Sequence, residues 1–266
     1  MSDWEPELYN RFRRYRAEPV ELILARLPIS GDEHVADLGC GTGDHTIELA
    51  RRASRGKAFG VDLSPAMIDA AQKTRATLVP ELRDRVVFRV GDIARLDSER
   101  EYAILFSNAA LQWIPKHRAV LGQWLRALVP GGRMVIQMPA NDRETAKAAL
   151  SDLAHEEPWR ALLSGIDESF REVPPPGKYQ QMLREIGFSE IDCHYQTFHH
   201  PMQSPAEVVE WYRATGLRPF INALAEDRRT AFLDSYRHRL ESAYGTSGAV
   251  TFDFKRLFIW ARRPAA

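Results

Sequence analysis

The chain has 266 residues, 44% of them hydrophobic, which is enough apolar material for a substantial core and excludes a disordered protein. Lys plus Arg and Asp plus Glu both number 36, so no net field favours nucleic acid or an anionic membrane. A small-molecule substrate is therefore expected, while the composition leaves the oligomeric state open.

Two further features concern the compartment. Cys40 and Cys193 are the only cysteines, too few for a disulfide framework or a zinc site, so no metal is expected. The N-terminus has no basic-then-apolar signal pattern, and no apolar run approaches the roughly 20 residues that cross a bilayer. These features predict a cytoplasmic protein without a membrane partner.

The predicted elements begin with a helical segment in residues 1–30, whose pattern covers 7–27 and which Pro19 is expected to divide in two. Strands and helices then alternate, which favours a parallel sheet with helices on both faces. The predicted strands are 35–38, 58–62, 86–90, 103–107 and 133–137, and the predicted helices are 46–52, 65–78 and 117–128. Residues 129–132 are predicted to form a turn before the fifth strand.

The second half of the chain is richer in helical pattern. Helical segments are predicted at 143–163 and just before Gly187, and a sixth strand at 190–199 is expected to pair antiparallel with a last strand at 251–262. The intervening residues 200–250 have helical pattern at 205–215 and 227–244. Because insertions of this length are normally functional, we interpret residues 200–250 as a helical lid.

The most informative motif is the turn at residues 37–43, where an apolar strand breaks into three alternate glycines. Glycines let the backbone approach a ligand closely and adopt positive φ values. The dinucleotide fingerprint would need a glycine where Asp44 stands, so NAD or FAD fits poorly. Asp37 and Asp62, which flank the turn, suit a ligand with an ammonium group and a ribose diol instead.

Three segments together, residues 37–43, 62–67 and 91–93, resemble the Rossmann-like S-adenosylmethionine-dependent methyltransferases. The resemblance implies an α/β fold, namely a Rossmann-like seven-stranded, mostly parallel sheet with helices on both faces and a helical lid inserted before the last strand. It also implies a single domain over residues 1–266, with 31–138 as the cofactor-binding half. The residues that it assigns to S-adenosylmethionine are Asp37, Gly39, Gly41, Asp62, Leu63, Asp92, Ile93 and Asn108.

Residues 107–113 follow the fourth predicted strand, where this family places groups near the transferred methyl. Members that methylate planar amino groups usually carry Asn/Asp-Pro-Pro-aromatic there, and its absence favours an oxygen or carbon acceptor. Trp113 has two interpretations of equal weight, a pocket residue or a core aromatic beneath the next helix. Cys40 has no histidine near it in sequence and is interpreted as a small loop filler.

Arg218 and Arg256 each lie among aromatic and apolar residues, a setting in which guanidinium recognises carboxylates. Spacing alone would favour two structural ion pairs. Further motifs resemble family members that methylate a carboxylate of a small tricarboxylate such as trans-aconitate; they lie at 4–6, 9–16, 108–113, 137–139, 211–219 and 256–263. The substrate-binding residues that follow from this are Arg218, Arg256, Lys255, Tyr9, Gln112, Trp113 and His200.

A carboxylate acceptor simplifies the chemistry. A carboxylic acid with a pKa of about 4 is already ionised at neutral pH, so no general base and no catalytic residue is expected. Two other acceptors stay open: another small carboxylate, or malonyl-acyl carrier protein, whose acidic carrier would need a basic run that this sequence lacks. A non-catalytic S-adenosylmethionine-binding regulator is a third alternative.

Overall fold

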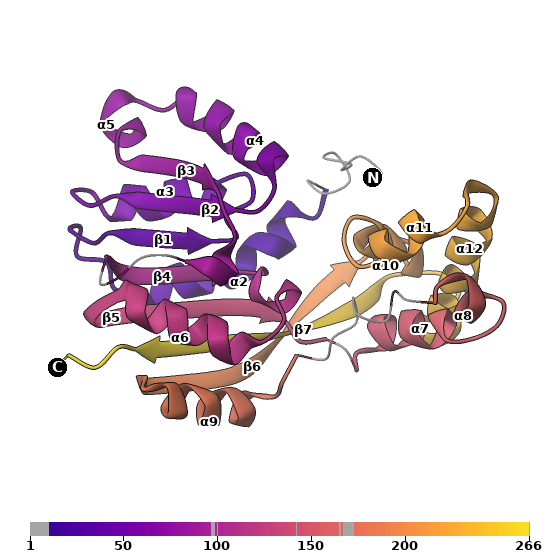
Figure 1. Cartoon of the computed structure of the whole chain (residues 1–266). Helices are drawn as coiled ribbons and strands as arrows, with labels where there is room; N and C mark the ends of the chain where they lie inside the picture. Colours follow the sequence, from indigo (N-terminus) through magenta and orange to yellow (C-terminus); the bar gives the residue numbers. More distant parts are fainter. Residues whose placement is uncertain are drawn as a thin grey trace. The chain divides into compact units, whose positions relative to one another are not determined.

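The computed structural model describes residues 11–96, 99, 101–141, 143–164, 166 and 173–265 (Figure 1). The chain forms two compact units. The sheet unit consists of Pro19–Pro139, Pro174–Tyr195 and Leu257–Ala266, and the helical unit consists of Met1–Glu18, Ala140–Val173 and Gln196–Arg256. The predicted insertion at 200–250 is therefore one part of a larger unit that also includes residues 140–173.

The sheet unit contains a seven-stranded sheet in the order β3-β2-β1-β4-β5-β7-β6. Its parallel pairs are β1 with β2 and β4, β2 with β3, and β4 with β5, whereas Figure 1 draws β7 with its arrow opposite to that of β1. The strands are β1 (Val35–Leu38), β2 (Ala58–Asp62), β3 (Val86–Val90), β4 (Tyr102–Asn108), β5 (Leu128–Pro139), β6 (Ser189–Met202) and β7 (Val250–Arg262). The sheet unit includes β6 as far as Tyr195 and β7 from Leu257 on, and the rest of these two strands belongs to the helical unit. This is the Rossmann-like, mostly parallel sheet that the sequence predicts.

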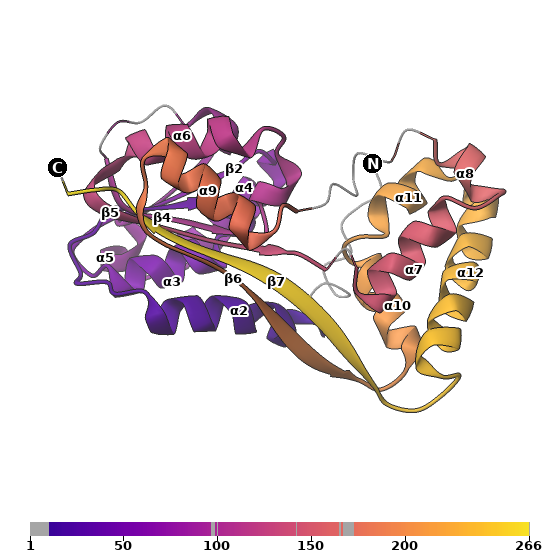
Figure 2. The same ribbon diagram turned by 90° about the horizontal axis from the view of Figure 1, so that it is seen from below.

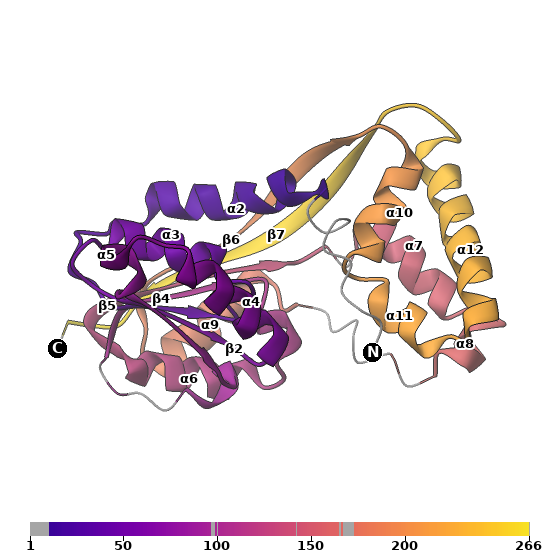
Figure 3. The same ribbon diagram turned by 90° about the horizontal axis from the view of Figure 1, so that it is seen from above.

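Helices cover both faces of this sheet. Figures 2 and 3 show α2 and α3 along one face and α6 and α9 along the other. The helices and short 3-10 turns of the sheet unit are α2 (Arg13–Arg26, from Pro19 on), α3 (Asp44–Arg52), α4 (Pro65–Ala76), α5 (Pro80–Arg83), η1 (Ile93–Arg95), η2 (Leu111–Trp113), α6 (His117–Ala127) and α9 (Pro176–Ile186). Because both faces are covered, all four residues of β1 are buried.

Two local predictions are wrong. Pro19 does not divide the N-terminal helix, since α2 runs through it without a break. Val20, Ile23 and Leu24 on the following turns are all buried, and this burial outweighs the roughly 3 kcal/mol that an internal proline costs. The predicted turn at 129–132 is instead an irregularity within β5, where Gly131 has φ +77° and the pairing with β4 shifts register.

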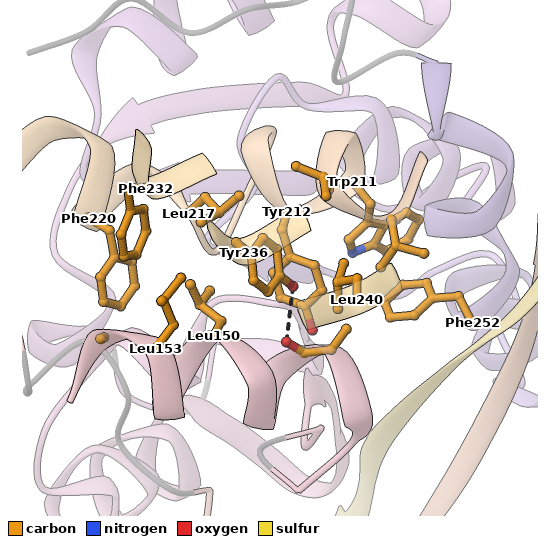
Figure 4. Packing of buried hydrophobic residues seen from close by; sticks show 14 of the residues in the cluster. Leu150, Leu153, Trp211, Tyr212, Leu217, Phe220, Phe232, Tyr236, Leu240 and Phe252 are labelled. Atoms are coloured by element: carbon orange, nitrogen blue, oxygen red, sulfur yellow. Dashed lines mark hydrogen bonds between the residues drawn. The ribbon is translucent and has the colours of Figure 1, made fainter. Parts of the chain in front are cut away.

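The helical unit is built from α7 (Thr145–Ala154), α8 (Trp159–Leu162), α10 (Pro205–Arg213), α11 (Arg218–Ala223) and α12 (Glu226–Tyr244). Helix α12 packs against α10 and α7 around a core that combines aromatic and aliphatic side chains (Figure 4). The buried Tyr236 hydroxyl donates to the Ala146 carbonyl at 3.0 Å, so this core leaves that polar group satisfied. No helix in the described part of the chain is both long and apolar enough to cross a membrane.

Candidate cofactor and substrate sites

The three glycines of the turn after β1 have different surroundings: two of them are closely packed and one faces open space. A Cβ on Gly39 would lie 2.2 Å from the Ala110 Cβ, and one on Gly43 would lie 2.3 Å from the Phe88 ring. A Cβ on Gly41 would meet nothing within 4 Å. All three glycines have positive φ, between +53° and +85°. Gly39 and Gly43 therefore permit close packing of the turn, and Gly41 borders the space that a ligand can use.

Asp62, the last residue of β2, holds this turn in place. Its Oδ2 accepts from the Gly41 backbone N–H and its Oδ1 accepts from the Ser64 backbone N–H, both at 2.9 Å. Each carboxylate oxygen retains a second lone pair, so both can still accept from ligand hydroxyls. The neighbouring Leu63 is 71% exposed and offers an apolar surface beside the carboxylate. This combination suits a ribose with its attached base.

Asp37 lies within β1 and is buried, with only 1% of its surface exposed. Its Oδ2 accepts from the Thr46 hydroxyl at 2.6 Å. Burial raises the pKa of Asp37 to about 7, although the Thr46 hydrogen bond works in the opposite direction and the nearby Asp62 charge adds to the rise. Asp37 therefore links the end of β1 to the start of α3 and in this way supports the glycine turn between them.

Asp92 and Ile93 follow the end of β3. The Asp92 Oδ1 accepts from the Ala94 N–H at 2.9 Å, which caps the short η1 turn. Ile93 is 8% exposed, and its carbonyl accepts from the Trp124 indole N–H at 2.9 Å. Because β2 and β3 are parallel, Asp62 and Asp92 belong to the same carboxyl edge of the sheet.

The turn after β4 carries two buried acceptor atoms. The Oδ1 of Asn108 and the Oε1 of Gln112 are both buried and have no hydrogen-bond partner among the described residues. Trp113 at the end of this turn is 63% exposed, so the interpretation as a core aromatic is wrong. Cys40 is buried and its pKa is raised by burial, which agrees with a loop filler that stays a thiol.

The chemistry of these acceptor groups fits S-adenosylmethionine. The edge of the sheet offers the carboxylates of Asp62 and Asp92, the free acceptor of Asn108 and the open side of Gly41. Acceptors of this kind suit ribose hydroxyls and an ammonium group, and they lie at the carboxyl ends of parallel strands, where open α/β sheets bind ligands. Fold and site together define a Rossmann-like methyltransferase.

Within the helical unit, Arg256 is buried against aromatic rings. It is 5% exposed, and its guanidinium lies 4.6 Å from the Phe254 ring centroid and 5.7 Å from that of Phe198. His200 is fully buried close by, and burial followed by the Arg256 charge lowers its pKa to about 4. His200 is therefore neutral at pH 7, with the Glu18 carboxylate 3.7 Å from its Nδ1.

Arg16 is a residue that the sequence prediction did not assign to the site. Its guanidinium lies 5.2 Å from the Trp211 ring, and Trp211 stacks on His200 with centroids 5.3 Å apart. We call the set of Arg16, Phe198, His200, Trp211, Phe254 and Arg256 the aromatic–cation cluster. Arg16 belongs to one of the motifs that carry the family resemblance, and membership of that motif could have indicated this residue from the sequence.

The other predicted substrate residues have different surroundings. The Lys255 ammonium is 2.8 Å from the Glu144 carboxylate, so a neighbouring acid already balances its charge. Arg218 is the first residue of α11 and is partly exposed. Tyr9 lies outside the described residues.

Comparison with known proteins agrees with this class. Residues 29–187 match the family model described as a methyltransferase domain. The trans-aconitate 2-methyltransferases of Variovorax paradoxus and Paracidovorax citrulli are 35% and 36% identical to this chain, each over 100% of both sequences. The crystal structure of the YcgJ protein from Bacillus subtilis has a TM-score of 0.64 at 15% identity, covering 92% of this chain and 98% of that one. The chain belongs to the trans-aconitate 2-methyltransferase family.

Proposed function

We propose that this chain transfers a methyl group from S-adenosylmethionine to a carboxylate of trans-aconitate, producing the monomethyl ester and S-adenosylhomocysteine. One observation carries the proposal: the likeness to trans-aconitate 2-methyltransferases covers the whole of both sequences. It therefore includes the helical unit with its buried Arg256 as well as the sheet unit, which many methyltransferases share.

S-adenosylmethionine, when bound, supplies an electrophilic methyl group on a positively charged sulfur. In this proposal Asp62 accepts from the ribose hydroxyls, while Asp92 and Ile93 border the adenine and Leu63 adds apolar contact. The open side of Gly41 leaves room for the cofactor backbone. Asp37 contributes through the turn that it supports.

The residues proposed to bind the substrate are chosen by their positive charge. A tricarboxylate needs cations, because a desolvated carboxylate without a partner is prohibitively costly. We assign that role to Arg256, held against Phe254 and Phe198, and to Arg218. We add Arg16, which lies over Trp211 in the same cluster as Arg256. Lys255 is a weaker candidate since Glu144 already compensates it.

The chain needs to bind, orient and desolvate an acceptor that is already a carboxylate, and it needs no proton acceptor for that task. The neutral, buried His200 fits a contact role better than that of a base. The lid assigned to residues 200–250 stays a prediction.

The test is a set of methyl-transfer assays with labelled S-adenosylmethionine and a panel of di- and tricarboxylates, together with malonyl-acyl carrier protein. Arg256→Met and Arg218→Met should each lower kcat/KM for trans-aconitate, by on the order of 2–5 kcal/mol in transition-state binding, and should leave S-adenosylmethionine affinity nearly constant. Arg228→Met, on the exposed side of α12, is the matched control. Preferred turnover of another acceptor, or no turnover at all, would contradict the assignment.

A further inference from the structure

A histidine and a tyrosine that the sequence did not assign to any site hold the short turn η2. His117 is the first residue of α6 and Tyr179 lies on α9, and the His117 Nδ1 is 2.6 Å from the Tyr179 hydroxyl. We propose that His117 and Tyr179 are positioning residues for methyl transfer, which fix Gln112 and Trp113 of that turn. The proposal rests on the proposed function, because the methyl acceptor that Gln112 and Trp113 are predicted to contact is the carboxylate proposed there.

The turn η2 has little support of its own. The Trp113 N–H donates to the Ala110 carbonyl at 3.1 Å, and the Ile114 N–H donates to the Leu111 carbonyl at 3.0 Å. Hydrogen bonds of this 3-10 type have poorer geometry than those of an α-helix, so a turn this short depends on its surroundings. Trp113 itself is 63% exposed and gains little from packing. Its position therefore depends on contacts made elsewhere on the turn.

The His117 side chain makes such a contact. Its Nε2 lies 3.0 Å from the carbonyl oxygen of Leu111, the first residue of η2. A carbonyl oxygen can only accept, so Nε2 carries the proton and the Nδ1 of the neutral ring is an acceptor. The Tyr179 hydroxyl therefore donates to Nδ1, and this bond stabilises the tautomer that holds Leu111.

Tyr179 anchors the pair in the core of the sheet unit. Its side chain is fully buried, and burial raises its pKa, so the hydroxyl remains a protonated donor. Its ring stacks on the imidazole of His117 with centroids 5.9 Å apart. A buried hydroxyl needs a partner, and His117 Nδ1 is nearer than its other contact, the Met138 sulfur at 3.9 Å. The contacts thus run from the core at α9 through His117 to the Leu111 carbonyl.

The chain enters α6 in a strained conformation. Lys116, directly before His117, has φ +61°, which is uncommon for a residue other than glycine, and its side chain does not cap the helix. Strain of this kind persists only where the surrounding contacts determine the conformation, and it concentrates at functional sites. The two hydrogen bonds of His117 are the contacts that follow directly after the strained residue.

The beginning of the segment after β4 has a different anchor. Asn108 ends β4 and pairs with Gln137 of β5, and the Ala109 N–H donates to the Gln137 carbonyl at 2.8 Å. These contacts belong to the sheet and do not involve His117. Loss of the His117 bond should therefore displace residues 111–113 and leave Asn108 in place. Because a displacement of about 1 Å can cost about a hundredfold in rate, we expect the loss to affect methyl transfer.

Steady-state kinetics and calorimetry on variants of the full-length protein test the proposal. His117→Leu removes both hydrogen bonds, and we expect it to lower kcat for trans-aconitate by about tenfold to a hundredfold, with S-adenosylmethionine affinity within about threefold of wild type. Tyr179→Phe should lower kcat less, and His117→Gln, which can still donate to Leu111, should recover most of it. Tyr236→Phe, which removes another buried hydroxyl bonded to a carbonyl, is the matched control and should keep its kcat.

Two further measurements separate positioning from a merely structural role. In a double-mutant cycle with Trp113→Ala, His117→Leu should lower kcat by less than about twofold once Trp113 is replaced, because both changes act through one turn. Amide hydrogen exchange of residues 111–114 in the protein without ligands should become about tenfold faster in His117→Leu. The same exchange should stay unchanged in Tyr236→Phe.

Three results would overturn the proposal: additive effects in the cycle, an equal loss of kcat in Tyr236→Phe, or a loss of S-adenosylmethionine affinity that accounts for the lost activity. If His117→Leu does not fold, Tyr179→Phe is judged by the same measurements and the same criteria. A wild type that methylates no small carboxylate would refute the proposed function instead. The exchange measurement, which needs no ligand, would then still show whether His117 holds the turn.

Discussion

The two units bury ionisable groups of opposite kind. In the sheet unit the buried group is an acid, Asp37, whose pKa is raised to about 7, mainly by burial. In the helical unit it is a base, His200, whose pKa burial and Arg256 lower to about 4. The sheet unit also presents acceptor atoms at its strand ends, while the helical unit holds cations over aromatic rings. Each unit therefore matches one ligand of the proposed reaction: the sheet unit matches a cationic cofactor and the helical unit an anionic acceptor.

The largest expected effect tests the acceptor character of the sheet unit. Asp62→Ala removes the carboxylate that accepts from Gly41 and Ser64, and in our proposal from two ribose hydroxyls. We expect S-adenosylmethionine affinity to fall by roughly 1.5–3 kcal/mol for each ribose bond lost, measured by calorimetry. Asp69→Ala, an exposed residue on α4, should leave the affinity unchanged. Undiminished binding by the Asp62 variant would remove it from the ribose site.

A second experiment isolates the buried acid of the sheet unit. Since the folded pKa of Asp37 is raised from 3.8 to about 7, its ionisation opposes folding, and the free energy of unfolding should fall as pH rises from about 4 to 7. The pKa shift corresponds to a loss on the order of 4 kcal/mol in the free energy of unfolding above pH 7. Asp37→Asn keeps an acceptor for Thr46 and should abolish this slope in denaturant titrations across that range. A wild type and variant with parallel pH profiles would contradict the prediction.

For the buried base of the helical unit, the free energy of unfolding should change with pH in the opposite direction. His200 is neutral in the folded protein down to about pH 4, whereas it is protonated below about 6.5 when unfolded, so its contribution to stability falls as pH drops from 6.5 to 4. His200→Phe should remove that dependence, and the effect should be smaller than for Asp37 because the pKa moves less. His155→Phe, at the exposed C-terminus of α7, is the control, and an equal change there would count against the prediction.

The smallest effect compares two glycines of one turn. Gly39→Ala would place a Cβ 2.2 Å from Ala110, so we expect a loss of about 1–3 kcal/mol in unfolding free energy even without ligand. Gly41→Ala meets open space and should cost roughly 1 kcal/mol for its positive φ, while weakening cofactor binding more than its stability loss implies. Thermal unfolding with and without S-adenosylhomocysteine separates the two. Equal losses of stability would show that Gly41 is also a packing position.

The local sequence pattern was sufficient to predict most of the secondary structure of the sheet unit. Strands β1, β2 and β3 have the bounds that the sequence predicts, because short apolar runs bounded by Gly and Asp are unambiguous signals. The predictions fail where tertiary contacts outweigh the local conformational preference of the residue. Pro19 stays helical because the helix around it is buried, and the expected turn at Gly131 is absorbed into β5 because a register shift accommodates it.

The sequence by itself was enough to predict which strand ends form the edge of the sheet that we propose binds the cofactor. In a parallel sheet the residues at the ends of successive strands meet at one edge, so Asp62, Asp92 and Asn108 could be grouped before any contact was known. Only the tertiary structure determines which ionisable groups are buried and in which protonation state they are held. Arg16 and His200 lie far apart in sequence and share Trp211 as a neighbour, and burial depends on such long-range contacts, which no local pattern encodes.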